Sequence, residues 1–131
     1  MIVLDASAVI ELLLGGPAAP AVAQRLAPPA ETLHAPHLLD LEVAQVLRRY
    51  ARAGLVSEER GREALRDLAD LGVERHAHEL FLPRIWELRD RATAYDAAYL
   101  TLAEALPATL VTLDARLARA GGHRARIELV S

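Results

Sequence analysis

Ile2-Val3-Leu4-Asp5 and Thr109-Leu110-Val111-Thr112-Leu113-Asp114 decide the fold, because each is a short, largely apolar run that ends at an aspartate. A run of this kind is typical of a strand that is buried on both faces of a sheet. A segment with the spacing of a helix follows each run, up to Leu14 in the first case and up to Gly121 in the second. Strand and helix are therefore expected to alternate at both ends of the chain.

The middle of the chain continues this alternation. Apolar residues recur at helical spacing over 38–52, after Pro36 and before Gly54, which predicts a helix there. Ser57 precedes two glutamates and is expected to cap a further helix, which Gly72 follows. The other predicted elements are a short helix at 21–27, a strand at 32–34, a weak strand at Val73, helices at 79–91 and 95–105, and an edge strand at 127–130.

The order of these elements indicates the fold class. Strands separated by helices imply parallel pairing through crossover connections. The sequence therefore predicts an α/β fold, a three-layer α/β/α sandwich with a mainly parallel, roughly five-stranded sheet. The 131 residues are the usual size of one domain, and no repeat or low-complexity linker divides them. We expect a single domain over 1–131.

The composition excludes several classes of site. There is no cysteine, which excludes disulfides, thiolate catalysis and cysteine-based zinc sites. All 15 basic residues are arginine, so no P-loop lysine or Schiff-base lysine exists. None of the three serines lies in a G-x-S-x-G pattern, which argues against a serine nucleophile. The first residues lack a basic n-region, and the apolar runs are far shorter than the roughly 20 residues that span a bilayer. We therefore expect a cytoplasmic protein.

Four acidic residues lie where an ordinary surface charge is not expected. Asp5 and Asp114 end apolar strands, and sites in parallel sheets form beyond the carboxyl ends of the strands. Glu42 and Asp96 lie in strongly apolar helices, where an ionised carboxylate is costly unless it is paired or bound to a metal. If the four converge, their repulsion raises their pKa values, and a divalent cation reverses that effect.

The chemistry of these carboxylates favours a hard cation. Oxygen ligands without cysteine suit Mg²⁺ or Mn²⁺ rather than zinc. Such an ion activates water and neutralises charge on phosphoryl oxygens, which favours phosphodiester hydrolysis. The formal charge of −3 argues against a nucleic-acid partner at first sight, but it becomes +1 once the four site acids are set aside.

Four segments that contain these acids resemble the motifs of the PIN-domain family, in particular the VapC-type toxins of bacterial toxin–antitoxin pairs. In chain order, the segments are Asp5-Ala6-Ser7-Ala8-Val9-Ile10, Leu39-Asp40-Leu41-Glu42-Val43, Thr93-Ala94-Tyr95-Asp96-Ala97-Ala98-Tyr99 and Thr112-Leu113-Asp114-Ala115-Arg116-Leu117. The resemblance runs along the whole chain, and the ordered set is far more specific than any one motif. Relatives often carry an asparagine two residues before Thr93, whereas this chain has Arg91 there.

The resemblance implies a PIN-like fold and a Mg²⁺- or Mn²⁺-dependent endoribonuclease that leaves 5′-phosphate and 3′-hydroxyl ends on RNA. It also implies a cognate VapB-type antitoxin and a homodimer. It assigns the metal-site and catalytic role to four acids, Asp5, Glu42, Asp96 and Asp114. Supporting polar roles fall to Ser7 and Thr112. Arg116 and Arg119, just beyond Asp114, are candidates for binding phosphate or RNA.

Most of these residues also have a purely structural interpretation. Either aspartate at a strand end can cap the helix that follows it. Glu42 can be exposed and paired with Arg49 or Gln45, and Asp96 can pair with an arginine. Asp40 competes with Glu42 for the same role, and we favour Glu42 on the motif.

Other polar residues leave further alternatives open. Ser7 can bond Asp5 or a metal-bound water, or can cap the first helix, and Thr112 suits a strand without any function. The helix at 38–52 carries arginines that are expected on its solvated side, where they can contact antitoxin or RNA. His76-Ala77-His78 invites a metal interpretation, but no other ligands with the spacing of a zinc site accompany it.

Two rival functions compete with a ribonuclease. The first is a catalytically inactive PIN-like module that binds RNA or protein and retains the acids by descent. The second is a phosphatase or phosphotransfer enzyme with Asp5 as its nucleophile. Asp5-Ala6-Ser7 lacks the second aspartate of a D-x-D phosphatase signature, so this rival ranks well below the first.

Overall fold

The computed structural model describes all residues 1–131, and its five strands form one all-parallel sheet. The order of strands across the sheet is β3-β2-β1-β4-β5, so that β1 is central. The strands are β1 (Ile2–Leu4), β2 (Leu33–Pro36), β3 (Val73–His76), β4 (Thr109–Thr112) and β5 (Arg126–Leu129). The predicted α/β fold with a five-stranded parallel sheet is confirmed.

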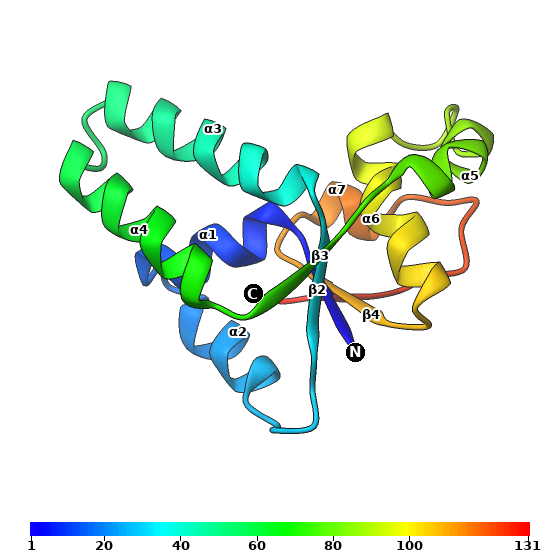
Figure 1. Ribbon diagram of the computed structural model, residues 1–131, viewed down its shortest axis with the longest axis horizontal. Coiled ribbons are helices and arrows are strands. Elements are labelled where there is room, and N and C mark those ends of the chain that lie inside the picture. The colour runs from blue at the N-terminus through cyan, green and yellow to red at the C-terminus, as the bar shows by residue number, and fades with distance from the viewer.

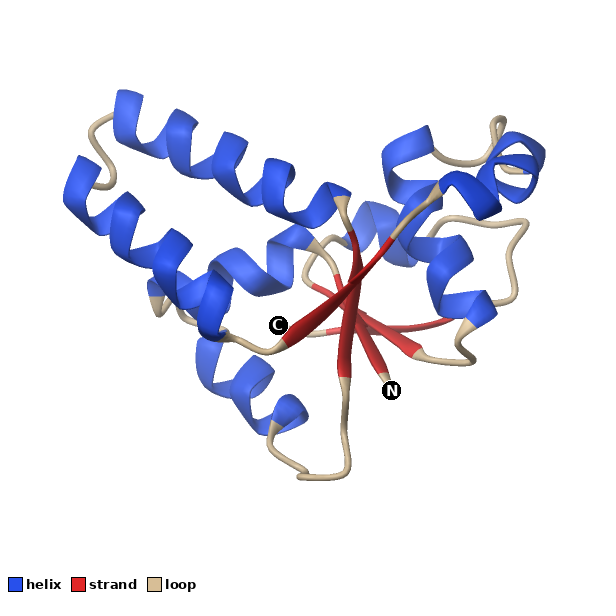
Figure 2. Ribbon diagram, viewed as in Figure 1, coloured by secondary structure: helices blue, strands red, loops and turns tan.

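Helices cover both faces of this sheet (Figures 1 and 2). One group comprises α1 (Ala6–Leu14), α2 (Ala19–Leu26), α3 (Leu38–Arg52) and α4 (Glu58–Asp70). The other comprises the 3₁₀ turn η1 (Glu79–Phe81), α5 (Leu82–Glu87), α6 (Ala94–Ala105) and α7 (Ala115–Ala118). Figure 1 shows the antiparallel pair α3 and α4 extending beyond the edge of the sheet.

The alternation of side chains along each strand divides the core between the two faces. Ile2 and Leu4 pack with α1 and α3 in one cluster, whereas Val3 between them packs with α5 and α6 in the other. All three side chains are fully buried. The central strand is therefore apolar on both sides, and the first polar position that it offers is Asp5, at its carboxyl end.

Most helices and strands begin and end close to the residues predicted from the local sequence. The helix expected at 38–52 is observed at those residues, and Gly54 follows it with φ of +74°, which favours glycine. The Ser57 hydroxyl accepts from the backbone N–H of Arg60 and caps α4. The strand expected at 32–34 instead covers Leu33–Pro36, where it pairs with both neighbours.

The single helix expected at 79–91 is wrong. This segment forms η1 and then the short helix α5, which ends at Glu87. Pro83 explains the break, because proline has no N–H and is tolerated in the first turn of a helix rather than in its interior.

No single helix is long and apolar enough to cross a bilayer. The pair α1 and α2 reaches that length and composition only when its two members are taken together across a bend of 110°.

Candidate active site

Asp5 directly follows β1 at the carboxyl edge of the sheet and is 6% exposed. Its Oδ1 accepts hydrogen bonds from the Ser7 hydroxyl at 2.7 Å and from the backbone N–H of Ala8 at 3.1 Å. Its Oδ2 accepts a hydrogen bond from the Thr112 hydroxyl at 2.6 Å. The bond from Ala8 caps α1. Capping is therefore only one of three interactions that fix this carboxylate.

Ser7, in the first turn of α1, and Thr112, at the end of β4, both bind the Asp5 carboxylate. Each hydroxyl donates its one proton to a different oxygen of Asp5. Each hydroxyl oxygen also accepts a hydrogen bond from a backbone N–H. Ser7 accepts from Leu113 at 2.9 Å, and Thr112 accepts from Asp114 at 2.9 Å. The loop after β4 is thereby tied to Asp5, which positions Asp114 beside it.

Asp114 and Asp96 are joined by the guanidinium of Arg116. Nη1 of Arg116 lies 3.0 Å from Oδ2 of Asp96, and Nη2 lies 3.3 Å from Oδ2 of Asp114. Asp114 also caps α7 by accepting from the backbone of Arg116 and Leu117. The structural alternatives for both acids are thus observed, and Arg116, expected to bind phosphate, pairs with both carboxylates.

Glu42 extends from α3 toward the same place and accepts a 2.6 Å hydrogen bond from the hydroxyl of Tyr99. Neither Arg49 nor Gln45 pairs with it. Asp40, its competitor, is instead bound to the guanidinium of Arg75 through three contacts of 2.8 to 3.1 Å. The structure therefore places Glu42, and not Asp40, with the other site acids.

Burial and mutual repulsion perturb these carboxylates. Burial raises the pKa of Asp5 above its ordinary value, hydrogen bonds from Thr112, Ser7 and Ala8 oppose that rise, and the charge of Asp114 adds to it. Burial also raises the pKa of Glu42, the Tyr99 hydroxyl opposes this, and the charges of Asp96 and Asp5 raise it further. The charge of Asp114 thus acts on Asp5, and the charges of Asp96 and Asp5 act on Glu42, so the four acids lie near one another.

The donor set fits a hard divalent cation. It consists of carboxylate oxygens and hydroxyls, with no sulfur or imidazole nitrogen among the four acids. The raised pKa values of Asp5 and Glu42 reflect an energetic cost that a cation would relieve. No three of the four acids have ligand oxygens that all lie within 4.8 Å of one another. Mg²⁺ suits such a looser arrangement, because it retains several waters and takes one or two carboxylates directly.

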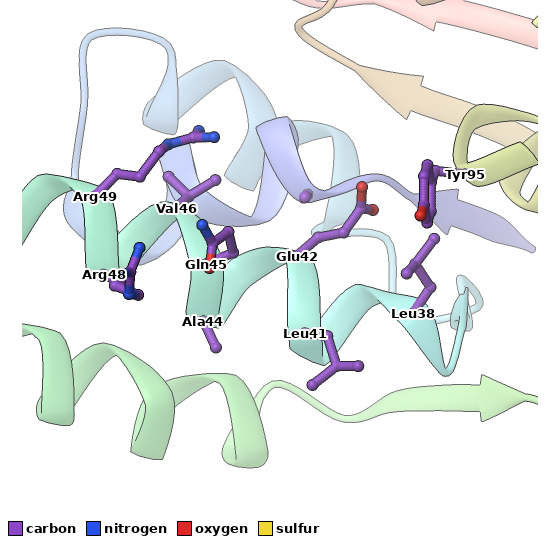
Figure 3. A pocket seen from close by; sticks show the side chains of 10 residues that line it. Leu38, Leu41, Glu42, Ala44, Gln45, Val46, Arg48, Arg49 and Tyr95 are labelled. Carbon is purple, nitrogen blue, oxygen red and sulfur yellow. The ribbon is translucent and has the colours of Figure 1, made fainter. Parts of the chain in front are cut away.

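An open groove leads away from these acids along α3 (Figure 3). It encloses about 690 Å³, and Glu42 and Tyr95 form one end of it. Arg48 and Arg49 line its other end. The groove therefore connects one of the four carboxylates, that of Glu42, to positive charge, an arrangement that suits an extended anionic chain. Arg119, the second predicted phosphate ligand, is exposed and its side chain forms no ion pair.

Sequence reasoning missed Tyr99. Its hydroxyl is the only group that donates a hydrogen bond to Glu42, and its side chain is 2% exposed. A signal was present, because Tyr99 lies three residues after Asp96 and hence on the same side of α6. A buried tyrosine needs a partner for its hydroxyl, and an acid from another helix supplies it here.

Known proteins are similar to this chain in sequence and in fold. The PIN domain family matches residues 2–123. Ribonuclease VapC12 of Mycobacterium tuberculosis is 44% identical over 131 residues, which covers 100% of both chains. Ribonuclease VapC9 of the same species is also 44% identical over 131 residues and covers 99% of this chain and 98% of the relative. The crystal structure of VapBC2 from Rickettsia felis, bound to a DNA fragment from their promoter, superposes with a TM-score of 0.72 at 17% identity over 100% of both chains.

Proposed function

Because this chain belongs to the PIN-domain family and to its VapC-type ribonucleases, we propose that it is an endoribonuclease that hydrolyses RNA phosphodiester bonds. The observation that carries the proposal is that Asp5, Glu42, Asp96 and Asp114 come together from four separate segments, where burial and the charges of neighbouring acids raise the pKa of Asp5 and of Glu42.

The four acids would hold a divalent metal ion, which we propose is Mg²⁺ or Mn²⁺. When bound, such an ion supplies an activated water and neutralises charge on the phosphoryl oxygens. Ser7 and Thr112 orient Asp5 and favour its ionised form through their hydroxyl protons. Tyr99 does the same for Glu42.

The arginines position the substrate. Arg48 and Arg49 would bind the RNA backbone along the groove that ends at Glu42. Arg119 would contact a phosphate beyond Asp114, and Arg116 would do so after leaving the two aspartates.

The same premise extends to partners. We propose that a VapB-type antitoxin binds this chain and restrains its activity, and that the chain forms a homodimer as a single domain over 1–131. The substrate would be cellular RNA, so the site of action would be the cytoplasm.

The test is cleavage of a mixed RNA substrate by the purified protein, with Mg²⁺, with Mn²⁺ and with EDTA. We expect cleavage only with metal, and products that carry 5′-phosphate and 3′-hydroxyl ends. The variants Asp5→Asn, Glu42→Gln and Asp96→Asn should lose at least about 100-fold in rate. Asp40→Asn is the matched control and should retain activity.

Two outcomes would contradict the proposal. One is cleavage by the three variants at the rate of the parent protein. The other is RNA binding by the parent without any cleavage in either metal, which would favour the catalytically inactive module instead.

A further inference from the structure

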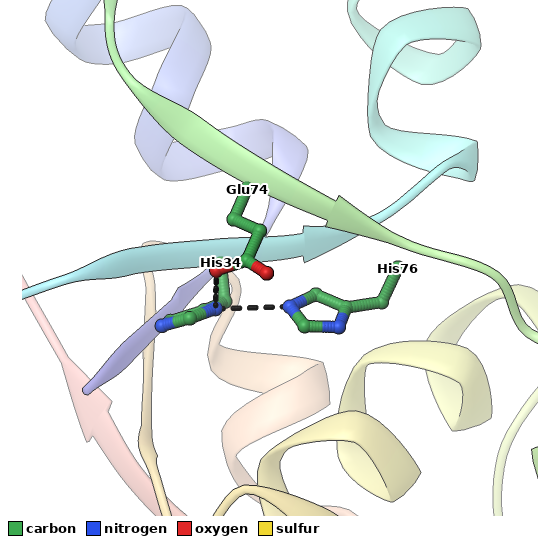
Figure 4. Close-up of side chains that lie close together, drawn as sticks. All are labelled: His34, Glu74 and His76. Carbon is green, nitrogen blue, oxygen red and sulfur yellow. Dashed lines mark hydrogen bonds and ion pairs between the residues drawn. The ribbon is translucent and has the colours of Figure 1, made fainter.

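A second group of metal-ligating side chains lies away from the four acids, on the edge strand β3 and its neighbour β2 (Figure 4). His34 is paired in register with Glu74, and Pro36 with His76. In-register residues of adjacent strands point to the same face, as do residues two apart on one strand. The topology therefore brings His34, Glu74 and His76 together on one face of the sheet.

The ligand atoms of these three side chains all lie within 4.8 Å of one another, and no other His, Asp or Glu side chains form such a group. Nδ1 of His34 is 2.9 Å from Nε2 of His76 and 3.6 Å from Oε2 of Glu74. Two ligand atoms on one tetrahedral zinc ion are about 3.3 Å apart, given bonds of about 2.0–2.1 Å. The observed separations bracket that value, so a bound ion requires only small side-chain movements.

Thr32 prepares His34 for this role. Its hydroxyl lies 2.8 Å from Nε2 of His34, so the ring can donate its Nε2 proton there and present the lone pair of Nδ1 to the cluster. Polar partners of this kind commonly orient histidines that bind metals. Burial and the neighbouring His76 lower the pKa of His34, which keeps the ring in the neutral form that coordinates an ion.

The chemistry of the group differs from that of the four acids. Two imidazole nitrogens and one carboxylate are typical ligands of zinc and of similar transition-metal ions, whereas Mg²⁺ prefers oxygen alone. We propose that His34, Glu74 and His76 form a second metal site, which binds Zn²⁺ with water as the fourth ligand. His78, the other member of the pair that drew attention in the sequence, is exposed and takes no part.

Such a site would join the edge strand to the sheet. His34 lies on β2, whereas Glu74 and His76 lie on β3, so one ion would add a metal link to the backbone hydrogen bonds and the side-chain contacts of His34 that already join the two strands. The inference does not depend on ribonuclease activity, since no hydrogen bond or ion pair connects these residues to the four acids. Its expected effect is a gain in stability.

The test is titration of the metal-free protein with Zn²⁺ by calorimetry and with Co²⁺ by visible absorption. We expect one site with the intense absorption of four-coordinate Co²⁺, and a rise in melting temperature with Zn²⁺. His76→Ala and Glu74→Gln should each weaken Zn²⁺ binding at that site at least tenfold and abolish the rise. Neither side chain is fully buried, so circular dichroism should show that both variants fold.

Controls separate this site from the four acids. His78→Ala, two residues further along the chain, should bind Zn²⁺ like the parent, and so should Asp96→Asn. Mn²⁺ binding should be unchanged in His76→Ala. The proposal is overturned if the parent shows no four-coordinate Co²⁺ spectrum, or if Zn²⁺ binding survives in His76→Ala but is lost in Asp96→Asn.

Discussion

The hydroxyl of Thr112 donates a 2.6 Å hydrogen bond to Oδ2 of Asp5, a residue 107 positions away in the sequence. The register of the sheet explains the contact, because Leu4 pairs with Val111 and the next residues on both strands are therefore neighbours. This hydrogen bond joins the carboxyl ends of β1 and β4, where polar residues follow the apolar runs of both strands. The backbone N–H of Asp114 donates to the same hydroxyl. Thr112 thus supports two site acids at once.

We expect Thr112→Val to destabilise the protein by about 1–3 kcal/mol, since valine leaves a buried carboxylate oxygen and a backbone N–H without partners. RNA cleavage should fall about 10- to 100-fold, as is common when a group that orients a metal ligand is removed. Thr101→Val is the matched control, because Thr101 is equally buried but donates only to the Ala98 carbonyl of its own helix. Equal losses of activity in the two variants would refute the role assigned to Thr112.

Tyr99→Phe removes the only side-chain proton given to Glu42. The pKa of Glu42 should rise further, because the hydroxyl is what opposes the effect of burial. Weaker Mn²⁺ binding by roughly tenfold is expected in calorimetry at neutral pH, from a bond to a charged group worth about 1.5 kcal/mol. Tyr95→Phe, on the exposed first turn of the same helix, should bind Mn²⁺ as the parent does. No change in affinity with Tyr99→Phe would show that the bond is incidental.

Glu42 should make the stability of the metal-free protein depend on pH. Because its folded pKa is raised above the ordinary 4.5, the folded protein binds this proton more readily than the unfolded chain does. The free energy of unfolding of the metal-free protein therefore falls as the pH rises from the ordinary value through the raised one. Glu42→Gln removes that loss, so its melting temperature at pH 7.5 in EDTA should exceed that of the parent by about 2–5 °C. The difference should vanish near pH 4.

Glu104 provides a control of the opposite sign for that experiment. Hydrogen bonds from Arg84 lower the pKa of Glu104, so its contribution to stability is present above the ordinary value and is lost as the pH falls. Glu104→Gln should therefore lower the melting temperature at pH 7.5. A lower melting temperature for both variants at that pH would mean that the charge of Glu42 is not costly in the fold.

Arg116→Ala should tighten Mn²⁺ binding by about 2- to 10-fold, because metal and guanidinium compete for Asp96 and Asp114 and each exposed ion pair is worth about 0.2–1 kcal/mol. Calorimetry on Arg116→Ala and Arg119→Ala makes the comparison, since the second variant removes a nearby arginine without an ion pair. Unchanged or weaker binding in Arg116→Ala would show that this arginine does not compete with the ion.

The sequence predicted those features that depend on local patterns. Asp5 and Asp114 were identifiable because each interrupts a buried apolar run, and the sheet order places those two runs side by side. Pro83, in the first turn of α5, was visible too, yet one helix over 79–91 was predicted.

Features that depend on register were beyond the sequence. His34 and His76 lie 42 residues apart, and only the pairing of β2 with β3 reveals that their rings meet. The same limit applied to Arg116, whose place just beyond Asp114 suggested phosphate binding and whose side chain reaches back to Asp96. The partner of a long side chain depends on where the fold places both residues, and their spacing in the sequence does not specify that.

The central position of β1 has a consequence for biosynthesis. Thr112 and Asp114 lie more than a hundred residues after Asp5 in the chain, so a ribosome makes Asp5 well before these neighbours. Until β4 has emerged and docked, a nascent chain holds the Asp5 carboxylate without the Thr112 hydroxyl or the neighbouring strand. A site built in this order stays unassembled until the strand that carries Thr112 has left the ribosome.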